Sequence, residues 1–298
     1  MSRLRNYLSL VKFSHTLFAL PFALIGFFLG IFAKNSSGQL RSQDQSSLLL
    51  RFFLVLVCMV TARSAAMAFN RWLDRHFDAR NPRTAIREIP RGIIAPNSAL
   101  RFVIICCILF TVTCWFINPI CFFLSPLALF VILFYSYTKR FTPLCHLVLG
   151  IGLSLAPIGA FLAVTGQFEV LPLLFSGAVI CWVSGFDIIY AMQDVDFDKS
   201  EKLYSIPTAL GKIRALRISS FLHVLCIVFV VMAGTRGEFG VWYWAGLFLF
   251  VGMLIYQHLI VKPNDLSRVN LAFMTANGIA SVVFAVFVIT DMFITHKH

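Results

Sequence analysis

The sequence predicts an all-α membrane protein whose helices cross the bilayer nine times. Of its 298 residues, 59% are hydrophobic and only 13% are charged, and the mean hydropathy is +0.84. A soluble domain of this size carries roughly twice that charged fraction. Lipid must therefore face much of the apolar surface, and a polytopic bundle is the fold class we expect.

The apolar runs locate the nine helices. A helix needs about 20 apolar residues to cross the hydrocarbon core of a bilayer, which is far longer than a strand requires. Such runs lie at 16–33, 49–69, 100–117, 119–138, 145–164, 171–192, 216–234, 240–261 and 269–290. The turn at Asn118-Pro119 separates two runs that would otherwise merge. We expect one transmembrane domain over 1–298.

Basic residues indicate how the helices are oriented. If the N-terminus is cytoplasmic, nineteen Lys and Arg residues fall on the cytoplasmic side and five on the other side. This is the asymmetry of the positive-inside rule, and it predicts an external C-terminus. The same rule explains the net charge of +12, so we expect a lipid bilayer and no nucleic acid as partner. Arg63 is counted on neither side, because it lies inside the second predicted helix.

Acidic residues are scarce, and six of the thirteen lie in two short segments. Each segment holds three polar residues spaced four apart. The triplets are Asn70, Asp74 and Asp78, and Tyr190, Asp194 and Asp198. On a helix, this spacing places each triplet on one face, as a polar stripe. The stripes begin at the cytoplasmic ends of the second and sixth predicted helices, so the two halves of the chain resemble a diverged repeat.

Four of these carboxylates predict a magnesium site. Two like charges 4 Å apart repel by about 4 kcal/mol at an effective dielectric of 20, so a cation should join them. Mg²⁺ takes oxygen ligands and commonly bridges carboxylates to phosphate oxygens. We expect Asp74, Asp78, Asp194 and Asp198 to bind Mg²⁺ around one diphosphate. The alternative is solvated charges paired with Arg71 or Arg75, and for Asp196, which points off the stripe, solvation is favoured.

At these residues the sequence resembles the UbiA superfamily of membrane aromatic prenyltransferases. The family motif N-x-x-x-D-x-x-x-D matches at Asn70, Asp74 and Asp78. The motif D-x-x-Y-x-x-x-D-x-x-x-D matches at Asp187, Tyr190, Asp194 and Asp198. The loop that begins Asn81-Pro82-Arg83-Thr84, the segment Lys139-Arg140-Phe141-Thr142 and the segment 202–207 also resemble family segments. The resemblance implies a bacterial inner-membrane enzyme with cytoplasmic cap loops at about 79–99 and 199–215.

Two departures from the family pattern bear on the acceptor. Many members carry Asn-Asp where this chain has Asn70-Arg71, and the N-terminal D-K-P segment of many members is replaced by 11–15. Both features resemble a bacterial subgroup similar to 4-hydroxybenzoate polyprenyltransferases. Part of that subgroup is assigned to 1,4-dihydroxy-6-naphthoate on the futalosine route to menaquinone. The implied reaction transfers a polyprenyl group from polyprenyl diphosphate to either aromatic acid.

Further residues are expected to serve this reaction. We expect Asn70 to supply a neutral ligand oxygen or hydrogen bond, and Arg83, Lys199 and Lys202 to bind phosphate oxygens. Tyr190 is placed to stabilise an allylic cation through its ring.

Three residues remain for the acceptor. Asp187 lies deeper in the membrane, where an acid is costly, so we expect it to orient the phenol or take its proton, or else to pair with Arg63. Arg63 shares the face of the first stripe and is a partner of Asp187 or a ligand for diphosphate or carboxylate. The resemblance implies that Arg140 holds the carboxylate of the acceptor.

Two other classes of protein fit parts of the pattern. A transporter also has many helices and a weak repeat, but its ionisable site usually lies near the bilayer midplane, whereas most of these acids lie at one end. Superfamily members of the haem or chlorophyll type remain alternatives for the acceptor.

Overall fold

The computed structural model describes residues 3–11, 19–33 and 45–295, and the regular structure in this part of the chain is helical, apart from one isolated bridge between Lys262 and Asp265. The first three helices are α1 (Arg3–Leu10), α2 (Leu20–Ile31) and α3 (Gln45–Leu73). Then follow α4 (Arg75–Arg80), α5 (Pro96–Ile117), α6 (Pro119–Thr138), α7 (Cys145–Thr165) and α8 (Val170–Ala191). The last are α9 (Val195–Ser200), α10 (Ile206–Leu210), α11 (Lys212–Arg236), α12 (Val241–Ile260) and α13 (Asn277–Thr295).

The predicted helices are confirmed in order and kind. Within the described residues, eight helices are long and apolar enough to cross a membrane, and α2 is a shorter apolar helix at the position of the first predicted span. Residues 16–18 of that prediction lie outside the described part. Helix α1 is an additional element that the apolar runs did not predict. The segment predicted as the second cap, about 199–215, contains α10 and the first turn of α11, which begins at Lys212.

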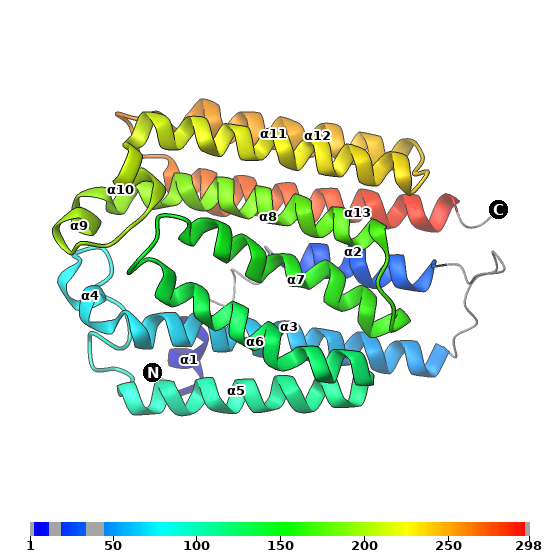
Figure 1. The fold of residues 1–298 in the computed structure, drawn as a ribbon, viewed down its shortest axis with the longest axis horizontal. Coiled ribbons are helices and arrows are strands. Elements are labelled where there is room, and N and C mark those ends of the chain that lie inside the picture. Colours follow the sequence, from blue (N-terminus) through cyan, green and yellow to red (C-terminus); the bar gives the residue numbers. More distant parts are fainter. Residues whose placement is uncertain (1–2, 12–18, 34–44, 296–298) are drawn as a thin grey trace.

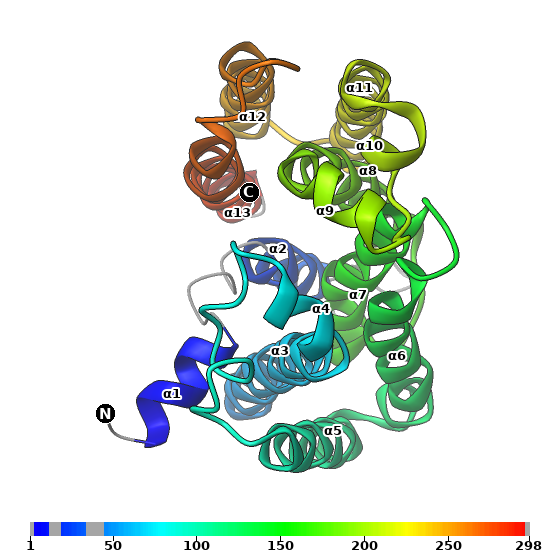
Figure 2. The ribbon, with the colours of Figure 1, turned by 90° about the vertical axis from the view of Figure 1, so that its left-hand side faces the viewer.

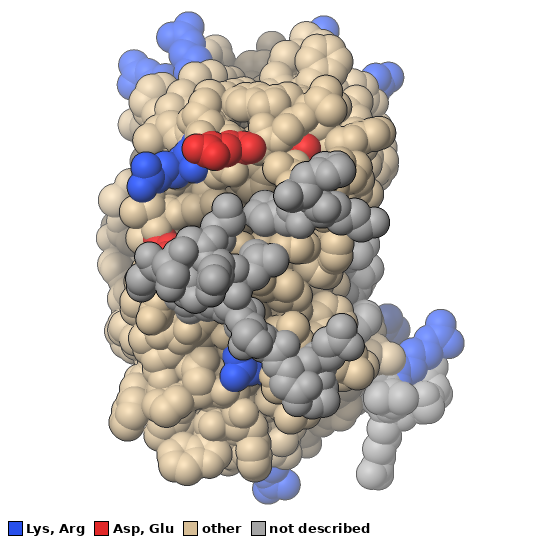
Figure 3. Space-filling view, turned by 90° about the vertical axis from the view of Figure 1, so that its right-hand side faces the viewer, with Lys and Arg blue, Asp and Glu red and all other residues tan. Residues whose placement is uncertain are grey.

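The long helices lie side by side along the long axis of the molecule (Figure 1). Seen from one end, they form an arch in which α3, α5, α6, α7, α8, α11, α12 and α13 follow one another, and α2 closes it by packing on α7 and α13 (Figure 2). The short helices α4, α9 and α10 all lie at this end, and α13 ends at the opposite one (Figure 1). The opposite face is mostly uncharged, with scattered charged side chains (Figure 3). The arch therefore brings both acidic motifs to one end of the bundle.

A close contact fixes α2 against α7. Gly26 of α2 faces the backbone of Pro157, and a Cβ atom added at Gly26 would lie 1.9 Å from the Pro157 carbonyl oxygen. Only glycine allows the two backbones to approach this closely. Around this contact Phe22 and Trp182 are fully buried, with ring centroids 5.3 Å apart. This packing fixes α2 inside the arch, against α7.

A buried carboxylate joins α12 to α13 at the end remote from the site. Asp291 is 1% exposed, and its oxygens accept hydrogen bonds from the backbone N–H groups of Gly240 at 2.7 Å, Trp242 at 3.1 Å and Tyr243 at 3.3 Å. These groups belong to the first turn of α12, where backbone N–H groups lack helical partners and the helix dipole favours negative charge.

We predict that Asp291→Ala lowers the stability of the protein in detergent, because these N–H groups lose their acceptor. Losing a helix cap costs roughly 0.5–2 kcal/mol. Asp291→Asn retains an acceptor oxygen and should lie between the wild type and Asp291→Ala. Thermal unfolding followed by tryptophan fluorescence measures the effect, with Asp265→Ala on an exposed turn as the control. Equal midpoints for Asp291→Ala and Asp265→Ala would contradict the capping role.

Candidate functional site

Each polar stripe crosses a helix junction instead of lying on one continuous helix. Helix α3 ends at Leu73, Asp74 precedes α4, and Asp78 lies within α4. The backbone N–H of Asp74 still bonds the Asn70 carbonyl at 2.9 Å, and that of Asp78 bonds the Asp74 carbonyl at 2.8 Å. The second stripe passes likewise from α8 through a 3₁₀ turn at Met192–Asp194 into α9. The four-residue spacing thus survives both junctions.

The two stripes converge on one polar pocket with a volume of about 190 Å³. All but three of the predicted site residues line this pocket. They are Asn70, Asp74, Asp78, Arg83, Arg140, Asp187, Tyr190, Asp194 and Asp198. The two motifs therefore share one pocket, as the spacing of their acidic residues predicted. The alternative, in which the carboxylates are solvated in separate loops, does not agree with this arrangement.

Each of the four carboxylates has its own cation in the pocket. Arg140 Nη2 lies 2.7 Å from Asp74, Arg87 Nη1 lies 2.8 Å from both oxygens of Asp78, and Lys139 Nζ lies 2.8 Å from Asp198. Arg83 pairs with Asp194 through two nitrogens, of which Nε lies 2.9 Å from Oδ1. Three of these pairs join residues far apart in the sequence, so the ion pairs hold the two motifs together.

Burial and charge act against each other in these pairs. Burial raises the pKa of Asp74 above its ordinary value, although Arg140 opposes the shift. Burial alone would lower the pKa of Lys139, but the charge of Asp198 raises it above the usual value. The pKa of Arg83 is likewise lowered by burial and raised on balance by Asp194 and Tyr190. Lys139 and Arg83 therefore remain charged in the pocket.

The oxygen atoms of the pocket fit a hard divalent cation. Asp198 is 1% exposed, and among the described residues Lys139, 2.8 Å from Oδ1, is its one ion-pair partner. A buried carboxylate with so few partners is costly and is stabilised by a further cation. Within the described residues, no three His, Cys, Asp or Glu side chains form a ready cage for a metal. Mg²⁺ needs no such cage, since it is usually bound by one or two carboxylates together with phosphate and water.

Lys199 and Lys202 are not brought into the pocket. Both side chains are exposed, and neither lines the pocket. The lysine and arginine that do line the pocket, beside Asp198 and Asp78, are Lys139 and Arg87. Both were visible in the sequence, Lys139 beside Arg140 at a helix end and Arg87 in the loop after the first motif, but spacing alone did not connect them to the acids.

Tyr190 and Asn70 contact the ion pairs directly. Arg83 Nη1 donates a hydrogen bond to the Tyr190 hydroxyl at 2.9 Å, and its guanidinium lies 5.3 Å from the centre of the ring. The ring of Phe273 packs against that of Tyr190, with the two centroids 4.3 Å apart. Asn70 Nδ2 donates to Asp74 at 3.2 Å. Tyr190 therefore lines the pocket with its ring and its hydroxyl beside the Arg83 guanidinium.

Asp187 pairs with a residue that the sequence analysis did not single out. The Nδ1 atom of His146 lies 2.7 Å from Asp187 Oδ2, and both residues line the polar pocket. Among the described residues, no ion pair joins Arg63 to Asp187. The alternative that Arg63 neutralises Asp187 is thus not supported by the structure.

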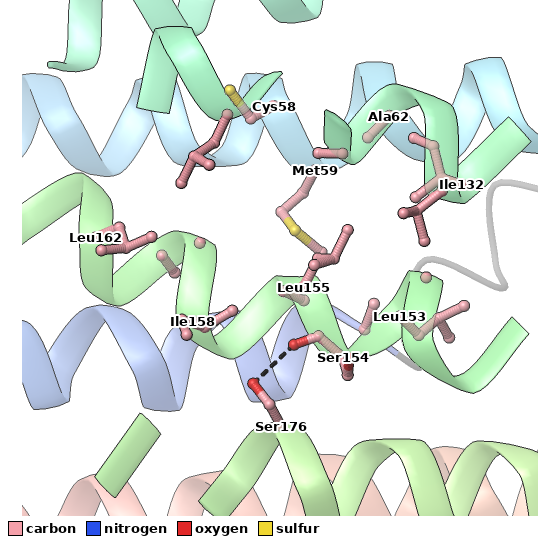
Figure 4. Close-up of a pocket in the computed structure, with 18 of the residues that line it drawn as sticks. Cys58, Met59, Ala62, Ile132, Leu153, Ser154, Leu155, Ile158, Leu162 and Ser176 are labelled. Atoms are coloured by element: carbon pink, nitrogen blue, oxygen red, sulfur yellow. Dashed lines mark hydrogen bonds between the residues drawn. The ribbon is translucent and has the colours of Figure 1, made fainter. Parts of the chain in front are cut away.

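An apolar cavity of about 620 Å³ adjoins the polar pocket. Met59 of α3, Ile132 of α6 and Leu155 of α7 point into it from three sides (Figure 4). Tyr135 lines both spaces and marks their junction. Arg63 lines the cavity too, and its Nε has no hydrogen-bond partner within the part of the chain that the structure describes. A guanidinium with an unused donor in an otherwise apolar cavity is suited to an anionic group of a ligand.

Arg71, the departure from the family pattern, faces away from the pocket. Its guanidinium pairs with Glu88, and the side chains are 3% and 13% exposed. The Ser9 hydroxyl of α1 donates to the same carboxylate. Glu88 is the residue after Arg87, whose guanidinium pairs with Asp78 in the pocket. Arg71 thus anchors the first cap loop and α1 to the end of α3.

Comparisons with a family model and with relatives of known name all point to one family of proteins. The model of the UbiA prenyltransferase family matches residues 19–279. A 4-hydroxybenzoate octaprenyltransferase of Tolumonas auensis is 31% identical over 80% of this chain and 82% of its own length. One of Nitrosomonas europaea is 30% identical over 84% of each chain.

Solved structures share the fold. The apo structure of a UbiA homolog from Aeropyrum pernix K1 superposes with a TM-score of 0.77 at 27% identity, over 95% of this chain and 98% of that one. A UbiA homolog from Archaeoglobus fulgidus, bound to DMAPP and Mg²⁺, gives a TM-score of 0.70 at 21% identity, over 97% and 99% of the two chains.

We predict that Arg71→Met destabilises the first cap loop, because it leaves the charge of Glu88 buried and unpaired. Removing one partner of a buried ion pair costs about 3–5 kcal/mol. The double variant Arg71→Met/Glu88→Gln removes both charges and should recover part of the loss. Proteolysis at 81–94 and thermal unfolding measure the effect. A double variant no more stable than Arg71→Met would argue against the pairing as the cause.

Proposed function

Since the chain belongs to the UbiA prenyltransferase family, we propose that it transfers a polyprenyl group from a polyprenyl diphosphate to an aromatic acid in ubiquinone or menaquinone biosynthesis. The observation that carries the proposal is the junction at Tyr135, where a charged pocket meets a long apolar cavity. A polyprenyl diphosphate has the same two parts, a charged head and an apolar tail. The protein lies in the bacterial inner membrane, with the pocket on the cytoplasmic side.

The polar pocket binds the diphosphate. Arg83, Arg87, Lys139 and Arg140 already face the carboxylates, and each can turn its donors to phosphate oxygens as the head group enters. Asp74, Asp78, Asp194 and Asp198, with help from Asn70, would hold Mg²⁺. When bound, Mg²⁺ neutralises the leaving diphosphate and so stabilises the charge that develops as the allylic C–O bond breaks. The Mg²⁺ in the Archaeoglobus fulgidus homolog supports this assignment.

The apolar cavity holds the prenyl tail. Burying an apolar chain there gains roughly 25 cal/mol for each Å² removed from water. It also keeps water away from C1 of the chain. Water that reached C1 would attack the allylic cation and convert it to a prenyl alcohol. The octaprenyl substrate named for the curated relatives supports a long chain.

The acceptor lies between the two spaces. Arg63 is the side chain best placed for its carboxylate, because it lines the cavity that Tyr135 shares with the pocket and its Nε has no hydrogen-bond partner among the described residues, whereas Arg140 lies with the phosphate-binding cations. This differs from the role that the resemblance implied for Arg140. Asp187 orients the phenol and takes its proton, and the ring of Tyr190 stabilises the allylic cation. Both 4-hydroxybenzoate and 1,4-dihydroxy-6-naphthoate carry the required carboxylate and hydroxyl.

The activity is tested with purified protein, Mg²⁺, an all-trans polyprenyl diphosphate and either aromatic acid, with mass spectrometry of the product. We expect a prenylated acid with one of the two acceptors and release of diphosphate in equal amount. Asp74→Asn and Asp194→Asn should each lower turnover by at least about 100-fold, since each removes charge that stabilises the transition state.

The matched control is Asp196→Asn, the same change at an exposed aspartate of the second motif. It should retain activity. Normal turnover by Asp74→Asn or Asp194→Asn would refute the role of the stripes. Absence of product with both acids, despite release of diphosphate with a haem or chlorophyll-type acceptor, would move the protein to another branch of the family.

The two arginines can be separated by steady-state kinetics. We expect Arg63→Ala to raise the KM of the acceptor by about 10-fold or more with little change for the diphosphate, because it removes a charge-assisted hydrogen bond worth about 1.5–3 kcal/mol. Arg140→Ala should act mainly on the diphosphate and on Mg²⁺ dependence. The reverse pattern would return the carboxylate to Arg140.

A further inference from the structure

His146 belongs to neither acidic motif, yet it faces the reaction space. It lies in the first turn of α7, is almost fully buried, and places Nδ1 2.7 Å from Oδ2 of Asp187. The Asp187 side chain is 24% exposed and lines the polar pocket. In the described part of the chain, no other donor contacts this carboxylate. Among the described side chains, His146 is thus the one that orients Asp187.

The second ring nitrogen determines what His146 can offer. The backbone N–H of Ile206 donates to Nε2 at 3.4 Å. A nitrogen that accepts a hydrogen bond carries no proton, so the neutral ring has its proton on Nδ1. The Nδ1–H group then donates to Oδ2, which leaves Oδ1 for the pocket. The network assigns this tautomer.

Ile206 belongs to the second cap segment, which is docked on the same region. The Tyr204 backbone N–H donates to the Lys139 carbonyl oxygen at 2.7 Å, and Cys145 Sγ lies 3.7 Å from the Tyr204 carbonyl oxygen. The Ser184 hydroxyl donates to the His146 carbonyl oxygen at 3.1 Å. Ser184 thus holds the His146 backbone, while the ring itself contacts Asp187 of α8 and Ile206 of the cap and so connects the docked cap to Asp187.

We propose that His146 is a positioning residue for prenyl transfer: it holds Asp187 by an Nδ1–H hydrogen bond so that Oδ1 accepts the hydroxyl proton of the acceptor, and the docked cap fixes the tautomer. The inference rests on the proposed function. As Asp187 takes the proton, a π pair of the ring forms the bond to C1 of the prenyl chain. The C1–O pair leaves with diphosphate.

The proton balance closes without any further reactant. The first product is a dienone, whose ring proton moves to the carbonyl oxygen as aromaticity returns. Asp187 then releases the proton that it accepted, so one proton leaves for each product formed. His146 keeps its own proton throughout, which is why its effect is on orientation.

Two amide substitutions separate this role from packing. The amide nitrogen of Asn in His146→Asn falls near the position of Nδ1, whereas that of Gln in His146→Gln falls near Nε2. We expect His146→Gln and His146→Leu to lower kcat for prenyl transfer by about 100-fold, the lower range for general-base catalysis, with the KM of the diphosphate unchanged. His146→Asn should recover at least about 10-fold of that loss. His76→Leu, at an exposed histidine, is the control.

A second readout uses the reaction without acceptor. Slow Mg²⁺-dependent conversion of the diphosphate to prenyl alcohol needs the polar pocket but not Asp187, so it should persist in all His146 variants. Equal kcat for the Asn and Gln variants, or loss of the acceptor-free reaction in step with prenyl transfer, would overturn the positioning role. If the wild-type protein prenylates no acceptor, the proposed function fails instead.

Discussion

Compensation of buried negative charge is the constraint on which the site depends. Four carboxylates lie at one end of an apolar bundle, and bringing them together without cations would cost several kcal/mol for each close pair. Their partners come largely from elsewhere in the chain: Arg83 reaches Asp194 across 111 residues, and Arg140 reaches Asp74 across 66. The charges that make the pocket suitable for a metal and a diphosphate thus also join the halves of the protein.

The second constraint is the separation of the charged pocket from the apolar cavity. The polar pocket and the apolar cavity meet at Tyr135, which lines both. A reaction through an allylic cation needs this division, because the leaving group requires charge and the cation requires the exclusion of water. The family match assigns the chain to enzymes rather than transporters, and the position of the acids at one end agrees with that assignment.

The caps connect these two demands. Arg71 and Glu88 tie the first loop to α3 and α1, and the neighbouring Arg87 holds Asp78. The second loop is docked on Lys139 and reaches His146 through Ile206. Behind Tyr190, a π-helical turn at Leu271–Ala276 carries Phe273 against the ring. The two cap loops and the Tyr190 ring are therefore each supported by a contact outside the pocket.

The sequence by itself determined the fold class, the order of the spans and the two acidic motifs. Length and hydropathy of the apolar runs are local properties, and a four-residue spacing survives even where α3 and α8 end before the stripes do. Only the tertiary structure decided the partners. Lys139 lies beside Asp198, Arg87 beside Asp78, and His146 instead of Arg63 beside Asp187. Such pairings depend on which helices pack together, and every positive charge near this end of the bundle satisfies the same topological rule, so composition and spacing could not distinguish them.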